Sequence, residues 1–428
     1  MVKSRRDPGS AWRLPTASIA VMAIVLAACG PAASGSPSTA ASVPASQAAN
    51  LEPVPMRIGA LIPQTGALSG IGPALEQPLL MGAEEINAES DGLVTVDVAD
   101  DGTDPTIAGQ AVDQFLTGDH NGIIGPAASG VATALWDEVD TAEMVMCSGS
   151  STGAIFSTEA FNPNHVRTAP SDNIQGPLLG NLILEDGSTD VAVVWRSDEY
   201  GVGFGEAVAA AVADSGGNVV LQQAYDKDLT SFTDLAQEIV ASGAEALAMI
   251  TFQEGGQLFL DLQSAGFDGQ IYVADGFVDN VNDTVVPDLT QLAGIRGTYP
   301  SAAPSNGEAT FGERFAAFAP PDTPTVFSAH MYDCLAILVL AAQVAQSSDP
   351  TVYVDEIIGV TRDGEKCSLI ADCLEMVWAG TDIDYDGASG PLDFSPNGEP
   401  SLGVYDIIQY DAAGAVQAEE EIEGQLPS

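Results

Sequence analysis

Small hydroxyl residues cluster behind a short apolar run in the segment CSGSSTG, residues 147–153. Gly149, Ser151 and Gly153 have the G-x-S-x-G spacing of a hydrolase nucleophile elbow, which would make the chain a secreted serine hydrolase. That chemistry needs a histidine later in the chain, and the only distant one is His330, inside a helical pattern. The same hydroxyls and free backbone N–H groups also form a cradle for a carboxylate without any reaction. Both interpretations remain open on these residues alone.

A second cluster of potential ligands is the segment DIDYDGASGPLD at 382–393. Asp382, Asp384 and Asp386 precede a glycine with the spacing of a calcium loop. Position twelve is Asp393 instead of a bidentate glutamate, and the residues around it favour a strand where a calcium loop would continue into a helix. We expect a solvated turn and no metal, with calcium binding as the alternative.

Five cysteines are present, and four of them follow Cys29, namely Cys147, Cys334, Cys367 and Cys373. In an oxidising compartment these four pair in one of three ways. Cys367 and Cys373 flank a short polar segment, so we expect a local disulfide between them. Cys147 and Cys334 would then form a second pair, which the sequence does not decide. No histidine or cysteine cluster has zinc spacing.

Short β-rich runs that alternate with helical patterns must position these groups. The run RIGALI at 57–62 precedes a helical pattern near 74–89, and the alternation continues to about residue 147. It restarts with VAVVW at 191–195 after a polar stretch. This order implies parallel sheets with helices on both faces, so the fold class is α/β with two lobes.

The N-terminus has the pattern of a lipoprotein signal peptide. Basic residues precede an apolar run at 19–28 that is too short to span a bilayer, and small residues stand directly before Cys29. Cys29 is therefore expected to carry lipid and to anchor the chain at the outer face of the cytoplasmic membrane. An ordinary signal peptide cut nearby is the alternative. The following Ala, Ser and Pro-rich residues to 55 form a flexible tether.

The composition is strongly acidic, with 60 Asp plus Glu against 12 Lys plus Arg and a net charge of −48. Such a chain repels phosphate backbones and anionic lipid headgroups. We expect no nucleic-acid partner and no membrane contact apart from the lipid anchor.

The order of several segments adds a family resemblance: IGALIPQTGALSGIG, GPAASG, CSGSSTG, HVRTAPSD, DEYGVGFG, QSAGFDGQIYVADG, HMYDC and DGASGPLDFSPNGE. It resembles the amino-acid-binding lipoproteins of branched-chain amino acid ABC importers, which are type I periplasmic binding proteins. The resemblance implies two Rossmann-like lobes with parallel sheets, joined by a three-crossover hinge. The chain then divides into a signal peptide (1–28), a tether (29–55), lobe 1 (56–169 and 300–396), lobe 2 (170–299 and 397–415) and an acidic C-terminal tail (416–428).

The resemblance also implies which residues bind the ligand. Ser129 and the Thr152 N–H would hold an α-carboxylate. The Ser150 carbonyl, the Thr152 hydroxyl and the carboxylate of Asp275 would hold the α-ammonium. Tyr200 would close over the ligand from the second lobe. Ile71, Thr251, Phe252 and Phe327 would form the side-chain pocket, in which Ile71 and Thr251 replace aromatic residues of the family.

Together these observations predict a monomeric solute receptor that is not an enzyme and uses no cofactor. It would capture an amino acid of the branched-chain type, or a related small amide, between two lobes and deliver it to an ABC permease. A ligand-sensing receptor of the same fold and a secreted serine hydrolase are the alternatives.

Overall fold

The computed structural model describes residues 51–158, 162–302 and 311–427. The expected signal peptide at 1–28, the lipidated Cys29 and most of the expected tether lie outside the described residues. The described residues all belong to one compact unit.

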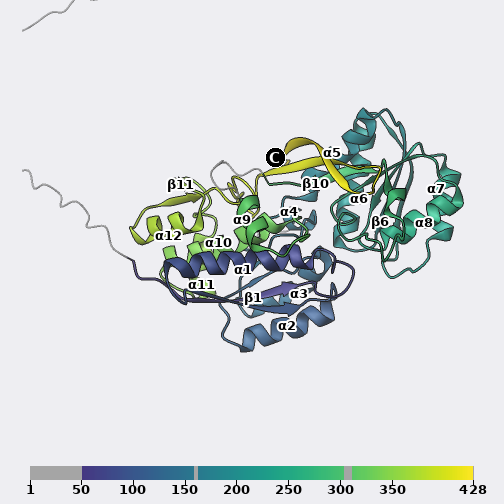
Figure 1. Ribbon diagram of the computed structural model, residues 1–428. Coiled ribbons are helices and arrows are strands. Elements are labelled where there is room, and N and C mark those ends of the chain that lie inside the picture. The colour runs from purple at the N-terminus through teal and green to yellow at the C-terminus, as the bar shows by residue number, and fades with distance from the viewer. Residues whose placement is uncertain (1–50, 159–161, 303–310, 428) are drawn as a thin grey trace, which may run out of the picture. The chain divides into compact units, whose positions relative to one another are not determined.

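Five parallel strands form the first sheet, in the order β2-β1-β3-β4-β5. The strands are β1 (Met56–Ile62), β2 (Val94–Asp100), β3 (Gly122–Ile124), β4 (Met146–Ser148) and β5 (His165–Arg167). The helices between them are α1 (Gly72–Glu89), α2 (Pro105–Thr117), α3 (Ser129–Thr141) and α4 (Ile155–Thr158). Helices α1 and α2 lie on opposite sides of β1 (Figure 1).

Seven strands form the second sheet, in the order β14-β13-β10-β9-β8-β6-β7. They are β6 (Asp190–Arg196), β7 (Asn218–Tyr225), β8 (Ala246–Ile250), β9 (Gln270–Val273), β10 (Arg296–Pro300), β13 (Leu402–Tyr410) and β14 (Val416–Gln425). Strands β6 to β10 are parallel, whereas β13 and β14 are antiparallel to their neighbours. The helices of this part are α5 (Asp172–Glu185), α6 (Glu199–Asp214), α7 (Thr233–Ser242), α8 (Gly255–Ala265) and the 3₁₀ helix η1 (Leu289–Leu292).

The segment between β10 and β13 is mainly helical. It contains α9 (Phe311–Phe318), α10 (Ser328–Ala345), α11 (Pro350–Tyr353), the 3₁₀ helix η2 (Val354–Glu356), α12 (Ile370–Trp378) and a parallel pair of short strands, β11 (Glu365–Cys367) and β12 (Ile383–Tyr385). Helix α10 is long and apolar enough to cross a membrane, but it is a core helix here, buried along most of its length. It packs against α1 and reaches β3 and β4 of the first sheet.

The apolar strand sequences explain this arrangement. Every residue of β8 is buried, and so is every residue of β6 after Asp190, as expected for parallel strands covered on both faces. The α/β fold class expected from the sequence is confirmed, with two mainly parallel sheets.

The C-terminal residues differ from the expected acidic tail. Residues Val416–Gln425 form strand β14, which pairs along its whole length with β13. Its glutamates are exposed, so neither face carries the apolar alternation by which a strand is usually recognised. Backbone hydrogen bonds to β13 hold this edge strand in place.

Candidate functional site

The candidate site lies where strand order reverses in each sheet. Strand β1 lies between β2 and β3, and β6 lies between β7 and β8, so connections leave these strands toward opposite sides. The carboxyl ends of parallel strands at such a point form a ligand-binding crevice. Eight predicted site residues follow strands of this kind or their neighbours, namely Ile71, Ser129, Ser150, Thr152, Tyr200, Thr251, Phe252 and Asp275, whereas Phe327 precedes α10.

The predicted carboxylate cradle is formed by the loop after β4 and the start of α3. Ser129 is buried, and its Oγ accepts a hydrogen bond from the backbone N–H of Gly153 at 3.0 Å. Ser129 thus bonds to this loop instead of capping its own helix. Gly153 permits the approach, because a Cβ atom there would lie only 3.0 Å from the Ser129 side chain. The buried Ser150 hydroxyl donates to the Ala127 carbonyl, and Thr152 is buried beside them.

Tyr200 and Asp275, placed together by the resemblance, are in contact. The Tyr200 hydroxyl donates to Asp275 Oδ1 at 3.3 Å and accepts from the Gly276 N–H at 3.3 Å. The Tyr200 ring stacks on Phe252 with 5.0 Å between ring centroids. The Arg196 guanidinium lies 3.6 Å from the centre of the Phe252 ring. This half of the site therefore presents one carboxylate framed by two aromatic rings.

The sequence reasoning missed a second carboxylate, that of Asp172 at the start of α5. Asp172 is fully buried, and neither of its side-chain oxygens has a partner with hydrogen-bond geometry among the residues that the structure describes. Its backbone N–H donates to the Thr152 carbonyl at 2.9 Å, which places it directly behind the cradle loop. Its position in the segment HVRTAPSD was the available signal, because a carboxylate that starts a helix at a chain crossover is not a typical core residue.

The two carboxylates share one environment of low polarity. Burial raises the pKa of Asp172 well above its usual value, and the Asp275 charge raises it further, whereas the Thr152 hydroxyl lowers it. Burial likewise raises the pKa of Asp275, partly offset by hydrogen bonds from Gln175 and Tyr200. A bound cation is the group that would let both carboxylates ionise.

Other polar atoms near these carboxylates also lack partners. Within the described part of the chain, the Thr251 hydroxyl, the Gln175 Oε1 atom and the Asn280 Oδ1 atom are buried without a hydrogen bond. Buried polar atoms are normally satisfied by protein, water or a ligand. Unpartnered donors and acceptors therefore surround the pair Asp172 and Asp275.

The four residues predicted for the side-chain pocket are all buried. Phe252 stacks on Tyr200, and Thr251 precedes it in the chain. Ile71 directly precedes α1. Phe327 has a left-handed backbone, with φ of 57°, and lines a cavity of about 410 Å³ together with Tyr299 at the end of β10. A strained backbone at a non-glycine residue is a frequent feature of ligand-binding positions.

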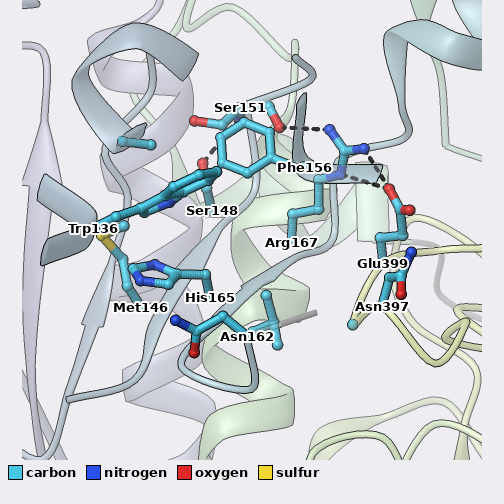
Figure 2. Close-up of a pocket in the computed structure, with 13 residues that line it drawn as sticks. Trp136, Met146, Ser148, Ser151, Phe156, Asn162, His165, Arg167, Asn397 and Glu399 are labelled. Carbon is cyan, nitrogen blue, oxygen red and sulfur yellow. Dashed lines mark hydrogen bonds and ion pairs between the residues drawn. The ribbon is translucent and has the colours of Figure 1, made fainter. Parts of the chain in front are cut away.

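A buried ion pair supports the cradle loop from behind. Arg167, in β5, donates through Nη1 to the carbonyls of Ser151 at 3.2 Å and Gly153 at 3.0 Å. Its other nitrogens bond to Glu399, which lies in the segment leading to β13. Figure 2 shows the guanidinium between Ser151 and Glu399. These bonds connect the loop to β5 and to the segment that leads to β13.

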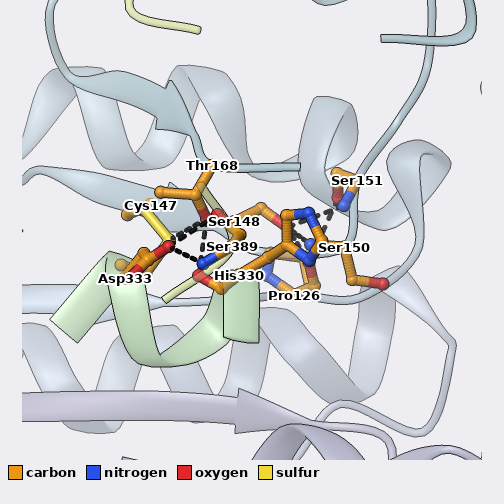
Figure 3. The surroundings of a disulfide bond; sticks show 10 residues. Pro126, Cys147, Ser148, Ser150, Ser151, Thr168, His330, Asp333 and Ser389 are labelled. Atoms are coloured by element: carbon orange, nitrogen blue, oxygen red, sulfur yellow. Dashed lines mark hydrogen bonds between the residues drawn. A yellow bond between two sulfur atoms is a disulfide. The ribbon is translucent and has the colours of Figure 1, made fainter. Parts of the chain in front are cut away.

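The structure contains the expected Cys367–Cys373 disulfide and also the Cys147–Cys334 pair, which the sequence left open. Cys147 and Cys334 are joined with Cα atoms 5.7 Å apart, and Cys367 and Cys373 with Cα atoms 5.5 Å apart. The first bond connects β4 to α10, next to the cradle loop (Figure 3). The Thr168 hydroxyl donates to the His330 carbonyl at 2.6 Å in the same place.

The geometry does not favour a serine nucleophile. The Ser151 hydroxyl donates to the carbonyls of Pro126 and Ala127 at 3.1 Å each, and it has no bond to a histidine among the described residues. Burial lowers the pKa of His330 to about 4, and its Nδ1 atom has no partner.

The acidic segment at 382–393 is paired with a lysine of β11. Lys366 Nζ lies 3.0 Å from Asp384 and 2.8 Å from Asp386. No group of three or more potential ligands with metal-binding geometry occurs within residues 51–158, 162–302 and 311–427.

Comparisons with known proteins agree with this geometry. A family model described as periplasmic binding protein matches residues 55–412. The chain is 24% identical to the chemotactic signal transduction system substrate-binding protein BasB of Halobacterium salinarum, over 84% of this chain and 88% of that protein. It is 22% identical to Leu/Ile/Val-binding protein homolog 3 of Brucella melitensis, over 83% of this chain and 91% of that protein.

Solved structures show the same fold. The leucine-binding protein LivK of Thermotoga maritima superimposes with a TM-score of 0.73 at 20% identity, covering 86% of this chain and 98% of LivK. The substrate-binding protein LivJ of Streptococcus pneumoniae, in complex with isoleucine, gives a TM-score of 0.69 at 18% identity, covering 86% and 99%.

Proposed function

Because the chain belongs to the periplasmic binding protein family, as a type I member of the branched-chain amino acid group, we propose that it captures a small ligand with a primary ammonium group. The proposed ligand is an amino acid or a related small amide. The chain would be a lipoprotein anchored through Cys29, and it would deliver the ligand to an ABC permease. The matched relatives are binding proteins and not enzymes, so the protein is a binding protein too.

The observation that carries this proposal is the buried pair Asp172 and Asp275 beside the cradle of Ser129 and Thr152. The cradle offers hydroxyl groups and backbone N–H groups to an anion, and the pair offers negative charge to a cation. A zwitterionic amino acid has both charges a short distance apart, so the two halves match it. Neither half has a lysine or arginine among its predicted contacts, so the carboxylate would be held by neutral donors.

Closure of the protein around the ligand would follow from the same arrangement. The cradle belongs to the first sheet, whereas Tyr200 and Asp275 belong to the second. A ligand held by both sets of residues stabilises only the state in which both reach it.

Isothermal titration calorimetry of the full chain with amino acids, amino-acid amides and small polyols tests the proposal. Asp275→Ala should weaken binding of an amine ligand by about 3 to 5 kcal/mol, because the buried ammonium loses its partner. Asp261→Ala is a matched control on α8, where the carboxylate accepts from Phe232 and Gln257 instead. The assignment is wrong if the ligand has no amine, or if Asp275→Ala binds within a factor of three of the parent chain.

A sensing role is the second candidate function. The relative BasB is the substrate-binding protein of a chemotactic signal transduction system. A neighbouring permease and ATPase gene would support import, and capture of a membrane receptor by the liganded chain would support sensing.

A further inference from the structure

The predicted ligand contacts are too deeply buried for a ligand to reach them in the arrangement that the structure describes. Ser129, Thr152 and Tyr200 are 1 to 2% exposed, and Asp275 is 5% exposed. The first two follow strands of the first sheet, whereas Tyr200 and Asp275 follow strands of the second. A ligand can therefore enter only when these two sets of segments move apart, and the contacts between the two sets determine how readily they meet again.

One such contact joins the loop between β1 and α1 to the loop after β9. A Cβ atom on Gly70 would lie 2.4 Å from the Asp279 carbonyl oxygen and 3.1 Å from the Asn280 Cα atom. Side-chain hydrogen bonds hold the second loop in place: the Tyr299 hydroxyl donates to Asp279 Oδ2 at 3.0 Å, and Asn280 Nδ2 donates to the Gly276 carbonyl at 3.1 Å. This contact therefore has no room for a side-chain carbon at residue 70.

A second contact joins α6 to the residue after the cradle loop. A Cβ atom on Gly203 would lie 2.9 Å from the Ala154 Cβ atom and 3.3 Å from the Ala154 nitrogen. The methyl group of Ala154 is attached directly to the backbone, so it cannot rotate away. Its carbonyl accepts from Asn173 Nδ2 at 3.4 Å, and the carbonyl of Gly153 before it accepts from Arg167. The backbone around Ala154 is thus held on both sides of the contact.

Neither glycine is required by its own backbone conformation. Gly70 and Gly203 are not among the described glycines with positive φ. Gly203 lies within helix α6, where alanine favours the helix more than glycine does. Alanine would therefore suit the local backbone at both positions. What excludes it is the segment on the other side of the contact, because a Cβ atom less than 3.0 Å from a neighbouring atom forces one of the two to shift.

We propose that Gly70 and Gly203 are positioning residues for ligand capture. The absence of a side chain at each position allows the segments of the two sheets to meet around the ligand, and an added Cβ atom holds them apart. Both residues are close in sequence to predicted ligand contacts, since Gly70 precedes Ile71 and Gly203 follows Tyr200 in α6. The two contacts do not depend on the proposed function, but the amino acid that serves as a probe of affinity rests on it.

Gly70→Ala and Gly203→Ala test the proposal in the full chain. The added Cβ atom penalises the state in which the segments meet, with or without ligand. Its cost appears as weaker binding if the free chain is mostly open, and as an opening of the free chain if it is mostly closed. Calorimetry with L-leucine measures the first effect, which should be an affinity loss of about tenfold. Small-angle X-ray scattering of the free chain measures the second effect, as a larger radius of gyration.

Gly130→Ala is the matched control between the same two sets of segments. Its Cβ atom would lie 3.5 Å from the Asp198 Cβ atom, which is an ordinary van der Waals distance. This variant should keep both the affinity and the radius of gyration of the parent chain. Circular dichroism shows whether each variant is folded. Since Gly70 and Gly203 lie in separate contacts, misfolding of one variant leaves the other to decide.

The proposal is overturned if Gly70→Ala and Gly203→Ala both keep the affinity and the radius of gyration of the parent chain. It is also overturned if Gly130→Ala changes these quantities as much as they do. If L-leucine does not bind the parent chain, its capture is excluded from the proposed function, and the scattering comparison alone decides the role of the two glycines.

Discussion

The Tyr200 hydroxyl donates to Asp275 Oδ1 across 3.3 Å, which joins the start of α6 to the end of β9. The same hydroxyl accepts from the Gly276 N–H, so it orients both the side chain of Asp275 and the peptide after it. A tyrosine in this position prepares the carboxylate for a ligand before the ligand arrives.

Tyr200→Phe should therefore reduce affinity for an amine ligand about tenfold, equivalent to one hydrogen bond to a charged group. The ring would still stack on Phe252, so the melting temperature should change little. Calorimetry on the variant measures the effect. Tyr225→Phe is the control, since that hydroxyl bonds to Glu254 instead. Equal losses in the two variants would argue against a special role for Tyr200.

Ligand binding should release protons. Burial raises the pKa of Asp172 and of Asp275, so part of the unliganded population is protonated at mildly acidic pH. An ammonium group needs ionised carboxylates, so affinity for an amine ligand should increase as pH rises from about 5 to 7.5. Calorimetry in buffers with different ionisation enthalpies counts the protons. Proton uptake, or no dependence on pH, would contradict the assignment.

The same pKa shifts predict how the free energy of unfolding of the unliganded chain depends on pH. Each folded-state pKa lies above its ordinary value. At pH values between the ordinary pKa and the folded-state pKa, the native state therefore binds more protons than the unfolded state. The free energy of unfolding should then fall as pH rises through that window. Asp172→Asn and Asp275→Asn should flatten this dependence and be more stable than the parent chain at neutral pH. Urea titrations at several pH values test this, and an unchanged slope in both variants would refute it.

The two disulfides should differ in their effects. Replacing Cys367 and Cys373 with serine should lower the free energy of unfolding by about 2 kcal/mol and leave affinity unchanged. Replacing Cys147 and Cys334 should lower both the free energy of unfolding and the ligand affinity, because that bond connects the strand before the cradle loop to α10. Thermal unfolding and calorimetry on the two double variants provide the comparison. A larger loss of affinity in the first variant would reverse this assignment.

Cys29→Ser should release the chain from membranes. The anchor is expected to be lipid alone, and the one described helix apolar enough to span a bilayer, α10, is buried in the fold. Fractionation of cells that express Cys29→Ser measures the release, and the chain from Met56 onward should keep full affinity. Retention of the variant in the membrane fraction would show that another segment anchors it.

The alternation of apolar strands and amphipathic helices predicted the fold class, because parallel strands buried on both faces are continuously apolar. The resemblance of DEYG and VADG to family segments named Tyr200 and Asp275 as ligand contacts, but not their hydrogen bond to each other. For Asp172 the only signal was its position in HVRTAPSD, because its burial behind the cradle loop results from tertiary contacts that a single sequence does not show. Likewise, the pairing of Lys366 with Asp384 depends on the contact of β11 with β12.

Strand β14 has a consequence for the behaviour of the chain in solution. An outer strand with free N–H and C=O groups is a template on which another polypeptide can add a strand. Here four glutamates, Glu419, Glu420, Glu421 and Glu423, lie along that outer strand, and among the described residues only Glu419 has an ion-pair partner, Arg296. Two copies of the protein that approached each other edge to edge would bring these like charges together. The glutamates of β14 thus disfavour edge-to-edge association of two copies through like-charge repulsion, and this repulsion is strongest at low ionic strength.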